Sequence, residues 1–170
     1  MKKLVIMLAI IVVSYIFPSH LIARTQVQEA PTAPPKVYEH KEAIVEYAMQ
    51  FGSDPQEIYS TEMCETKGVW KKGDYHNGKY HAFGNWQYWT DTWNRYERIY
   101  QQTYNVTDEF DITSDHDQVK LTAFVFSLGE KAKREWTTYV ALKNGGTYTF
   151  YSKKLQNTFT IVCKPSKLVI

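Results

Sequence analysis

The segment Cys64-Glu65-Thr66-Lys67-Gly68 is followed by His81-Ala82-Phe83-Gly84-Asn85-Trp86-Gln87 and then by Thr92-Trp93. This order places a carboxylate, Glu65, at the end of a helical pattern and before a loop rich in aromatic residues. Partial removal of a carboxylate from water disfavours its charged form and raises its pKa. A glycosidase needs such a protonated acid to donate to the leaving glycosidic oxygen. Taken alone, Glu65 is also explained as a solvated charge at a helix end, and Glu62 on the same helix is a rival acid.

Two helices are expected on the N-terminal side of this segment. Residues 41–51 place their apolar side chains on one face at helical spacing, and Gly52 ends the pattern. Ser53-Asp54-Pro55 predicts the start of a second helix, because a cap residue precedes a proline at an early helical position. The second helix carries Glu65, and we expect it to end at Gly68.

The rest of the chain alternates turn-rich and apolar segments. Residues 71–81 are polar, and Asn77-Gly78 within them predicts a loop or a small hairpin. Further elements are expected as helices over residues 91–100, 115–128 and 130–142, and as a hairpin over residues 147–151 and 158–162. These patterns predict a mainly helical α+β fold with a small β-hairpin, in one domain over residues 38–170.

The N-terminal segment has the pattern of an export signal. Lys2 and Lys3 precede an apolar run over residues 4–17. The small-residue cleavage pattern is poor, and residues 4–23 also reach the length of a membrane-spanning helix, so residues 1–23 are either a signal peptide or a membrane anchor. Residues 24–37 contain three prolines and predict a semi-rigid linker. We therefore expect an exported body, periplasmic or extracellular, or tethered to the cytoplasmic membrane.

Cys64 and Cys163 are the two cysteines of the chain. An exported protein can keep a disulfide, and an even count fits one bridge that closes a long loop. The alternative is one buried thiol and one exposed thiol. Two cysteines without nearby histidines at zinc spacing do not indicate a zinc site, and we expect no metal.

Composition bounds the classes of function. The 170 residues suffice for one domain, and 44% hydrophobic with 22% charged residues is ordinary globular usage rather than disorder. The net charge of +2 lacks the clustered basic excess of a nucleic-acid-binding domain. Aromatic residues make up 15% of the chain, which suits a carbohydrate or protein contact surface, or a core filled with rings.

The order of the motifs resembles the lytic transglycosylases of the soluble group related to goose-type lysozyme. In that family a helix with an Ala…Gly-(x)-Asp-Pro lead-in precedes Glu-Ser-Gly, Gly-x-x-Gln, Thr-Trp or Thr-Ala, and a buried late helix that ends in Gly. The corresponding segments here are Ala48 to Pro55, Glu65-Thr66-Lys67-Gly68, Gly84-Asn85-Trp86-Gln87, Thr92-Trp93, and Leu121 to Gly129 with Trp136. The resemblance covers about residues 41–139 and implies a lysozyme-like fold.

The resemblance implies a single catalytic acid/base, Glu65, acting on the bond between MurNAc and GlcNAc of peptidoglycan. Protonated Glu65 would protonate the glycosidic oxygen, and its carboxylate would then take the proton of the MurNAc 6-hydroxyl, giving a 1,6-anhydro product without a cofactor. Thr66 would stand where the family has a Ser that orients the acid. The residues expected to bind the glycan are Thr66, Gly84, Gln87, Tyr88, Trp89 and His81. Trp93 is expected in the core, and the protein is expected to be a monomer.

Three departures from the family pattern bear on these roles. Thr66 replaces Ser, and Lys67 places a cation close to Glu65. Phe126 stands in the family's Tyr-Asn-x-Gly segment, where the Tyr hydroxyl often contacts the catalytic Glu.

Two alternative functions therefore stay open. A hydrolytic lysozyme of the same fold would need a second carboxylate to hold a water molecule, and Asp74 or Asp91 could supply it. A catalytically inactive glycan-binding or scaffold protein of a cell-envelope assembly would keep the fold and the aromatic cleft without cleavage.

Overall fold

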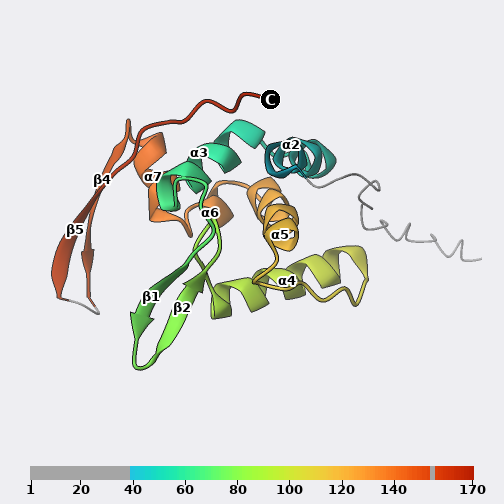
Figure 1. Cartoon of the computed structure of the whole chain (residues 1–170), viewed down its shortest axis with the longest axis horizontal. Coiled ribbons are helices and arrows are strands. Elements are labelled where there is room, and N and C mark those ends of the chain that lie inside the picture. The colour runs from blue at the N-terminus through green and yellow to red at the C-terminus, as the bar shows by residue number, and fades with distance from the viewer. Residues whose placement is uncertain (1–38, 154–155) are drawn as a thin grey trace, which may run out of the picture.

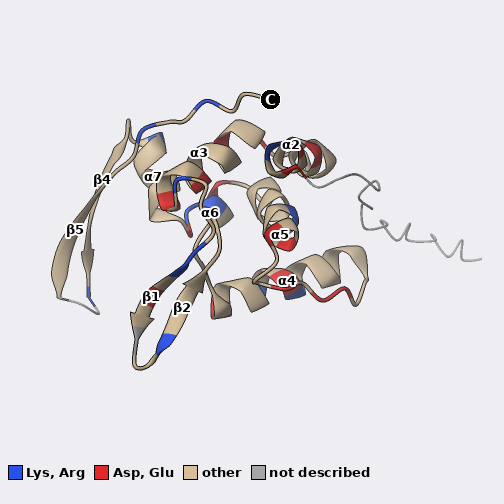
Figure 2. Cartoon of the chain, in the orientation of Figure 1, with Lys and Arg blue, Asp and Glu red and all other residues tan. Residues whose placement is uncertain are grey.

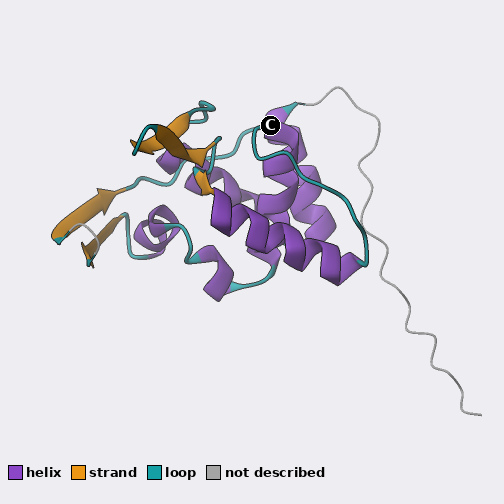
Figure 3. Cartoon of the chain, turned by 90° about the horizontal axis from the view of Figure 1, so that it is seen from below, coloured by secondary structure: helices purple, strands orange, loops and turns teal. Residues whose placement is uncertain are grey.

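The computed structural model describes residues 39–153 and 156–170, which contain six helices and five strands (Figure 1). The expected signal or anchor, residues 1–23, and the linker, residues 24–37, lie outside the described residues. The described chain has a mixed α and β fold, in which two small antiparallel sheets lie at one end of a cluster of helices (Figure 3). Charged residues of both signs are interspersed along it (Figure 2). None of the helices in these ranges has the length and apolar character that crossing a bilayer requires.

Helices α2 (His40–Phe51) and α3 (Pro55–Glu65) correspond to the two expected N-terminal helices. Gly52 ends α2 with a φ of 73°, in the left-handed region that glycine adopts readily. Asp54 caps α3 by accepting a hydrogen bond from a backbone N–H, as predicted. The helix ends at Glu65, earlier than the expected Gly68, so the candidate acid is the last helical residue.

The polar segment after α3 forms an antiparallel sheet in the order β1-β2-β3. Its strands are β1 (Lys72–His76), β2 (Lys79–Phe83) and β3 (Tyr88–Trp89). Asn77 and Gly78 connect the first two strands with φ values of 50° and 77°, and two positive φ angles are typical of a type I′ turn. The predicted hairpin is therefore confirmed, and the third strand adds an edge beside the aromatic loop.

Helix α5 (Asp115–Ser127) is buried along most of its length, as its apolar sequence predicts, and α4 (Thr90–Tyr104) packs against it. One polar side chain of α5, Gln118, is fully buried and accepts a hydrogen bond from the backbone N–H of Asn85. Gly84 lies so close to the Gln118 amide that a Cβ at this position would collide with it. The contact fixes the loop between β2 and β3 on the core helix.

The prediction of a single helix over residues 130–142 is wrong. The chain instead forms α6 (Glu130–Lys133) and α7 (Thr137–Lys143), with a break between them. At the break Trp136 has an extended backbone, with φ −93° and ψ 116°, and its ring is 6% exposed. Its indole Nε1 donates to the backbone oxygen of Trp86 at 2.8 Å. The burial of the Trp136 ring and its hydrogen bond to Trp86 accompany an extended backbone at Trp136, which interrupts the helix.

The hairpin expected near the C-terminus is confirmed as β4 (Thr147–Ser152) and β5 (Asn157–Val162). Directly after it, Cys163 forms a disulfide with Cys64. The predicted bridge is therefore confirmed, and the alternative of two unpaired thiols is wrong. Beyond the bridge the chain runs along α3, where the side chains of Gln56 and Ser60 both donate to the carbonyl oxygen of Ser166. The bridge and these bonds hold the C-terminal segment against the helix that ends at the candidate acid.

Replacing both cysteines by serine should lower the free energy of unfolding by about 2–4 kcal/mol, because the bridge restricts the unfolded chain across a sequence separation of 99. Urea unfolding of Cys64→Ser/Cys163→Ser beside the oxidised wild type measures the difference. A reductant should bring the wild type to the stability of the variant and leave the variant unchanged. Equal stability of the variant and the oxidised wild type would show that the bridge contributes nothing.

Candidate functional site

Glu65 is held at the end of α3 by a contact with α7. The hydroxyl of Thr138 donates to Glu65 Oε1 at 2.6 Å. Burial raises the pKa of the Glu65 carboxyl, and this effect outweighs the Thr138 hydrogen bond and the positive charge of Lys71, which both lower it. The carboxyl therefore keeps its proton to a higher pH than an exposed glutamate does.

Glu65 lies in a hollow of about 400 Å³, which we call the Glu65 cleft. Asp74, Gln87 and Trp89 line it from the side of the sheet. Residues 135–137, at the break between α6 and α7, line the opposite side. The sheet and the helix break thus form two walls of the hollow that contains the Glu65 carboxyl.

Gln87 is fixed within the cleft by the backbone around it. Its side-chain amide donates to the carbonyl oxygens of Gly84, at 2.7 Å, and Lys71, at 3.1 Å. Its φ of 51° is in the left-handed region, which non-glycine residues adopt rarely and often at functional sites. Gly73 approaches the Gln87 side chain so closely that a Cβ there would overlap Oε1. Gly73 is thus a supporting residue that the motifs do not mark.

The aromatic residues of this region differ in what they can offer a ligand. Trp89 is 43% exposed on the cleft wall, and the His81 ring lies 5.7 Å from its ring, centroid to centroid. Tyr88 also lines the cleft but is 1% exposed, and its hydroxyl is hydrogen-bonded to Thr122 at 3.0 Å. Trp93 is buried in the core, as expected. Of these two cleft residues, Trp89 is the exposed one, and Tyr88 is mainly part of the packing.

Thr66 and Gly84 support the site from behind and are not among the residues that line the cleft. The Thr66 hydroxyl donates to the backbone oxygen of Asn85 at 3.0 Å, which ties the end of α3 to the loop before β3. Gly84 holds the same loop against Gln118. Direct contact of either residue with a substrate stays a prediction.

The structure also shows where the charged residues lie whose roles the sequence leaves open. Lys67 is exposed with a φ of 61°, and the cation that acts on Glu65 is Lys71. Asp74 lines the cleft, whereas Asp91 lies in the first turn of α4 and is not part of the lining.

Sequence reasoning missed two residues of this site: Thr138, which bonds to Glu65, and Glu135, which lines the cleft. Thr138 and Glu135 lie on either side of Trp136, where the expected continuous helix is broken. Glu135 is paired with Arg95 of α4, with 2.9 Å between Oε1 and Nη2. No spacing pattern marks these residues, because their positions depend on a break that the apolar period does not show.

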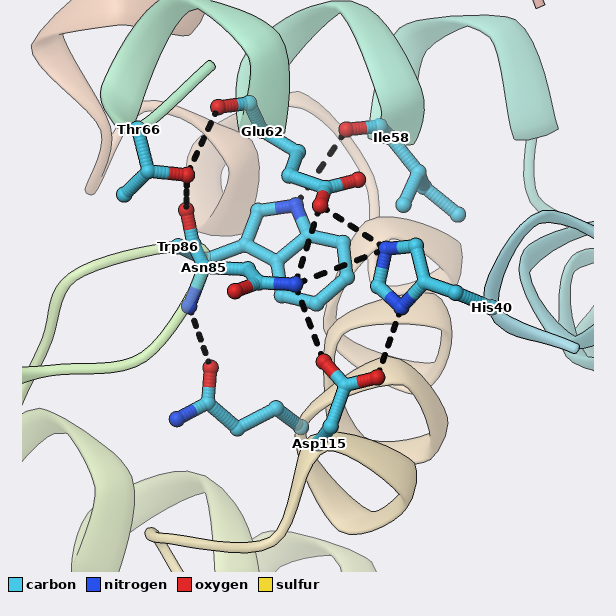
Figure 4. A network of polar contacts seen from close by, with 8 residues as sticks. His40, Ile58, Glu62, Thr66, Asn85, Trp86 and Asp115 are labelled. Atoms are coloured by element: carbon cyan, nitrogen blue, oxygen red, sulfur yellow. Dashed lines mark hydrogen bonds and ion pairs between the residues drawn. The ribbon is translucent and has the colours of Figure 1, made fainter. Parts of the chain in front are cut away.

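A second polar cluster surrounds Glu62, one helical turn before Glu65 on α3 (Figure 4). Glu62 is 0% exposed, and its Oε1 accepts from His40 Nε2 at 2.8 Å and from Asn85 Nδ2 at 3.0 Å. Asp115 accepts from the same two residues, at 2.7 Å from His40 Nδ1 and at 2.9 Å from Asn85 Nδ2. The rival acid Glu62 is therefore part of this cluster rather than of the Glu65 cleft.

His40 is the cation of the cluster. Burial favours its neutral form, but the hydrogen bonds and charges of Asp115 and Glu62 outweigh burial and raise the pKa of His40 to about 9. At neutral pH the cluster therefore joins the start of α2 to α3 and α5 through a charged imidazole.

Within residues 39–153 and 156–170, no group of three or more His, Cys, Asp or Glu side chains is arranged to hold a metal ion.

Comparison of the chain with protein-family models, with curated proteins and with solved structures finds no match. The indications of a function therefore come from the residues of the Glu65 cleft and of the His40 cluster.

The protein should lose stability between pH 6.5 and 9. A pKa raised from 6.5 to about 9 means that the stabilisation is complete below pH 6.5 and is lost as the pH rises through 9. Because the His40 side chain is 26% exposed, solvent screens its charge in part, and we expect the free energy of unfolding to fall by roughly 2 kcal/mol. Urea unfolding at a series of pH values measures it. His40→Gln should be less stable at pH 6.5 and lack this fall, and a variant that retains the whole fall would contradict the assignment.

Thr138→Val should raise the pKa of Glu65 further, because it removes a donor that stabilises the carboxylate and keeps the shape of the side chain. A titration followed by the ¹³C signal of the Glu65 carboxyl measures the change. Thr137→Val is the matched control, since this neighbouring threonine lines the cleft without a hydrogen bond to Glu65. The same shift in both variants would mean that the Thr138 hydrogen bond has no specific effect.

Proposed function

We propose that this protein is a peptidoglycan lytic transglycosylase with a lysozyme-like fold, and that Glu65 is its single acid/base. The observation that carries the proposal is a carboxyl with a raised pKa at the end of a helix, inside a cleft that Gln87 and Trp89 also line. A protonated carboxyl near neutral pH is what a general acid for glycoside cleavage requires.

In the proposed reaction Glu65 donates its proton to the glycosidic oxygen between MurNAc and GlcNAc as the bond from that oxygen to the MurNAc C1 breaks. The resulting Glu65 carboxylate then removes the proton of the MurNAc 6-hydroxyl while O6 forms a bond to C1. The product is a 1,6-anhydroMurNAc end, and the carboxyl is protonated again. No water and no second carboxylate takes part in this reaction, so Glu65, held by the Thr138 hydroxyl, is the one acid that it requires.

Thr138 supports this proposal where the chain departs from the family. Phe126 is 1% exposed and packs against the Trp136 ring, so position 126 provides no hydroxyl. The hydroxyl at Glu65 comes from Thr138 instead, 2.6 Å from Oε1. We propose that Thr138 positions the acid in place of the family's tyrosine.

Asp74 favours a second candidate, a hydrolytic lysozyme of the same fold. It lines the same cleft as Glu65, where its carboxylate would hold a water molecule for attack on C1. An inactive glycan-binding or scaffold protein would use the cleft without proton transfer. These functions differ in their products, so one experiment separates them.

The disulfide bears on the compartment in which the protein works. Bridges such as Cys64–Cys163 persist in oxidising compartments. We propose an exported body, periplasmic or extracellular, that acts on glycan strands as a monomer or within an envelope assembly.

Mass spectrometry of peptidoglycan treated with the wild type should detect anhydro-muropeptides, and Glu65→Gln should reduce their yield at least about 100-fold, because general acid–base catalysis contributes that much. Asp91→Asn, outside the cleft lining, is the matched control and should retain activity. Reducing-end products that disappear in Asp74→Asn would indicate a lysozyme. No product from folded wild type would favour the inactive protein.

A further inference from the structure

A second hollow of about 570 Å³ lies beside the His40 cluster. It is lined by His40, Gly68, Trp70, Asn85, Thr113 and Asp115, and it shares no lining residue with the Glu65 cleft. Its wall combines an indole and an imidazole with an amide and a carboxylate, groups that pack against sugar rings and bond to their hydroxyls.

Two buried polar atoms of this wall have no hydrogen-bond partner among the described residues: the acceptor Asn85 Oδ1 and the donor Trp70 Nε1. Asn85 is 4% exposed, and its Nδ2 is fully used by Glu62 and Asp115. Figure 4 shows Oδ1 pointing away from these partners. A buried polar atom without a partner costs about 1–3 kcal/mol, so an unpaired acceptor and an unpaired donor in one hollow call for a ligand.

A secondary amide satisfies both atoms at once, since its N–H donates and its C=O accepts. The charges restrict the ligand further. His40 carries one positive charge, whereas Glu62 and Asp115 carry one negative charge each, so the site is negative by one charge and disfavours anions. Asp115, with its side chain 33% exposed, remains able to accept from hydroxyl groups.

We propose that this hollow binds an N-acetylhexosamine unit of the GlcNAc type, as a second sugar site apart from the Glu65 cleft. The acetamido N–H donates to Asn85 Oδ1, the acetamido oxygen accepts from Trp70 Nε1, and a ring hydroxyl donates to Asp115. A MurNAc unit fits less well, because its lactyl carboxylate meets the negative site. The choice of sugar rests on the proposed function, but binding here requires no cleavage.

The test uses ¹⁵N NMR of the full chain carrying Glu65→Gln, titrated with tri-N-acetylchitotriose. Each of the five tryptophans gives one indole N–H signal, and the signal that Trp70→Phe removes belongs to Trp70. That signal should shift with the N-acetylated trimer and stay in place with cellotriose, which lacks acetamido groups. Trp70→Phe should weaken binding at this site, followed by the backbone signals of Thr113 and Asp115, about fivefold, the effect of one hydrogen bond. The rest of its spectrum reports whether the variant is folded.

Trp89→Ala is the matched control for the Glu65 cleft, and it should leave the Trp70 shift unchanged. Shifts confined to Trp89 and its neighbours would overturn the second site and leave the proposed function intact. An equal response to cellotriose would overturn the acetamido contacts. A Trp70 shift in a protein whose wild type releases no muropeptides would support the second site while the proposed function fails.

Discussion

The arrangement of the molecule depends on the buried amide of Asn85. Its Nδ2 donates to Glu62 of α3 and Asp115 of α5, and its backbone N–H and C=O are bonded to Gln118 and Thr66. An isolated carboxylate at the position of Glu62 would be strongly unfavourable in a core, and hydrogen bonds with a counter-charge are what make it tolerable. The backbone oxygen of Asn85 also accepts from Thr66, so the residue that bonds to the buried Glu62 joins the end of α3 to the loop before β3.

Glu62 and Glu65 show how strongly surroundings decide the role of a side chain. They lie one helical turn apart on α3, yet Glu62 contacts His40 and Asn85 whereas Glu65 contacts a threonine hydroxyl at the edge of a cleft. The first side chain is held in place by a cation, whereas burial raises the pKa of the second. Two identical groups on one helix thus differ in their partners and in how their surroundings act on them.

The sequence predicted features that depend on residues close together in the chain. Asp54 caps a helix, Asn77-Gly78 forms a turn, and the apolar run of α5 is buried, as predicted. The break at Trp136 was not predictable, because it arises from an indole bonded to a backbone oxygen 50 positions away in sequence. Thr138 was missed for the same reason, and so was His40, which meets its two carboxylates only after three helices pack.

The placement of the C-terminal segment has a consequence for the order of events during synthesis. The residues that complete the surroundings of α3, Cys163 and Ser166, are translated about a hundred positions after the helix they cover. A nascent chain that ends shortly after Glu65 therefore lacks the C-terminal segment that bonds to Gln56, Ser60 and Cys64 of α3. The hydrogen bonds to Ser166 and the disulfide can form only after these later residues have left the ribosome, and the disulfide also needs oxidising conditions. Whatever the protein does, α3 acquires its full set of contacts only once the end of the chain has been synthesised and the disulfide has formed.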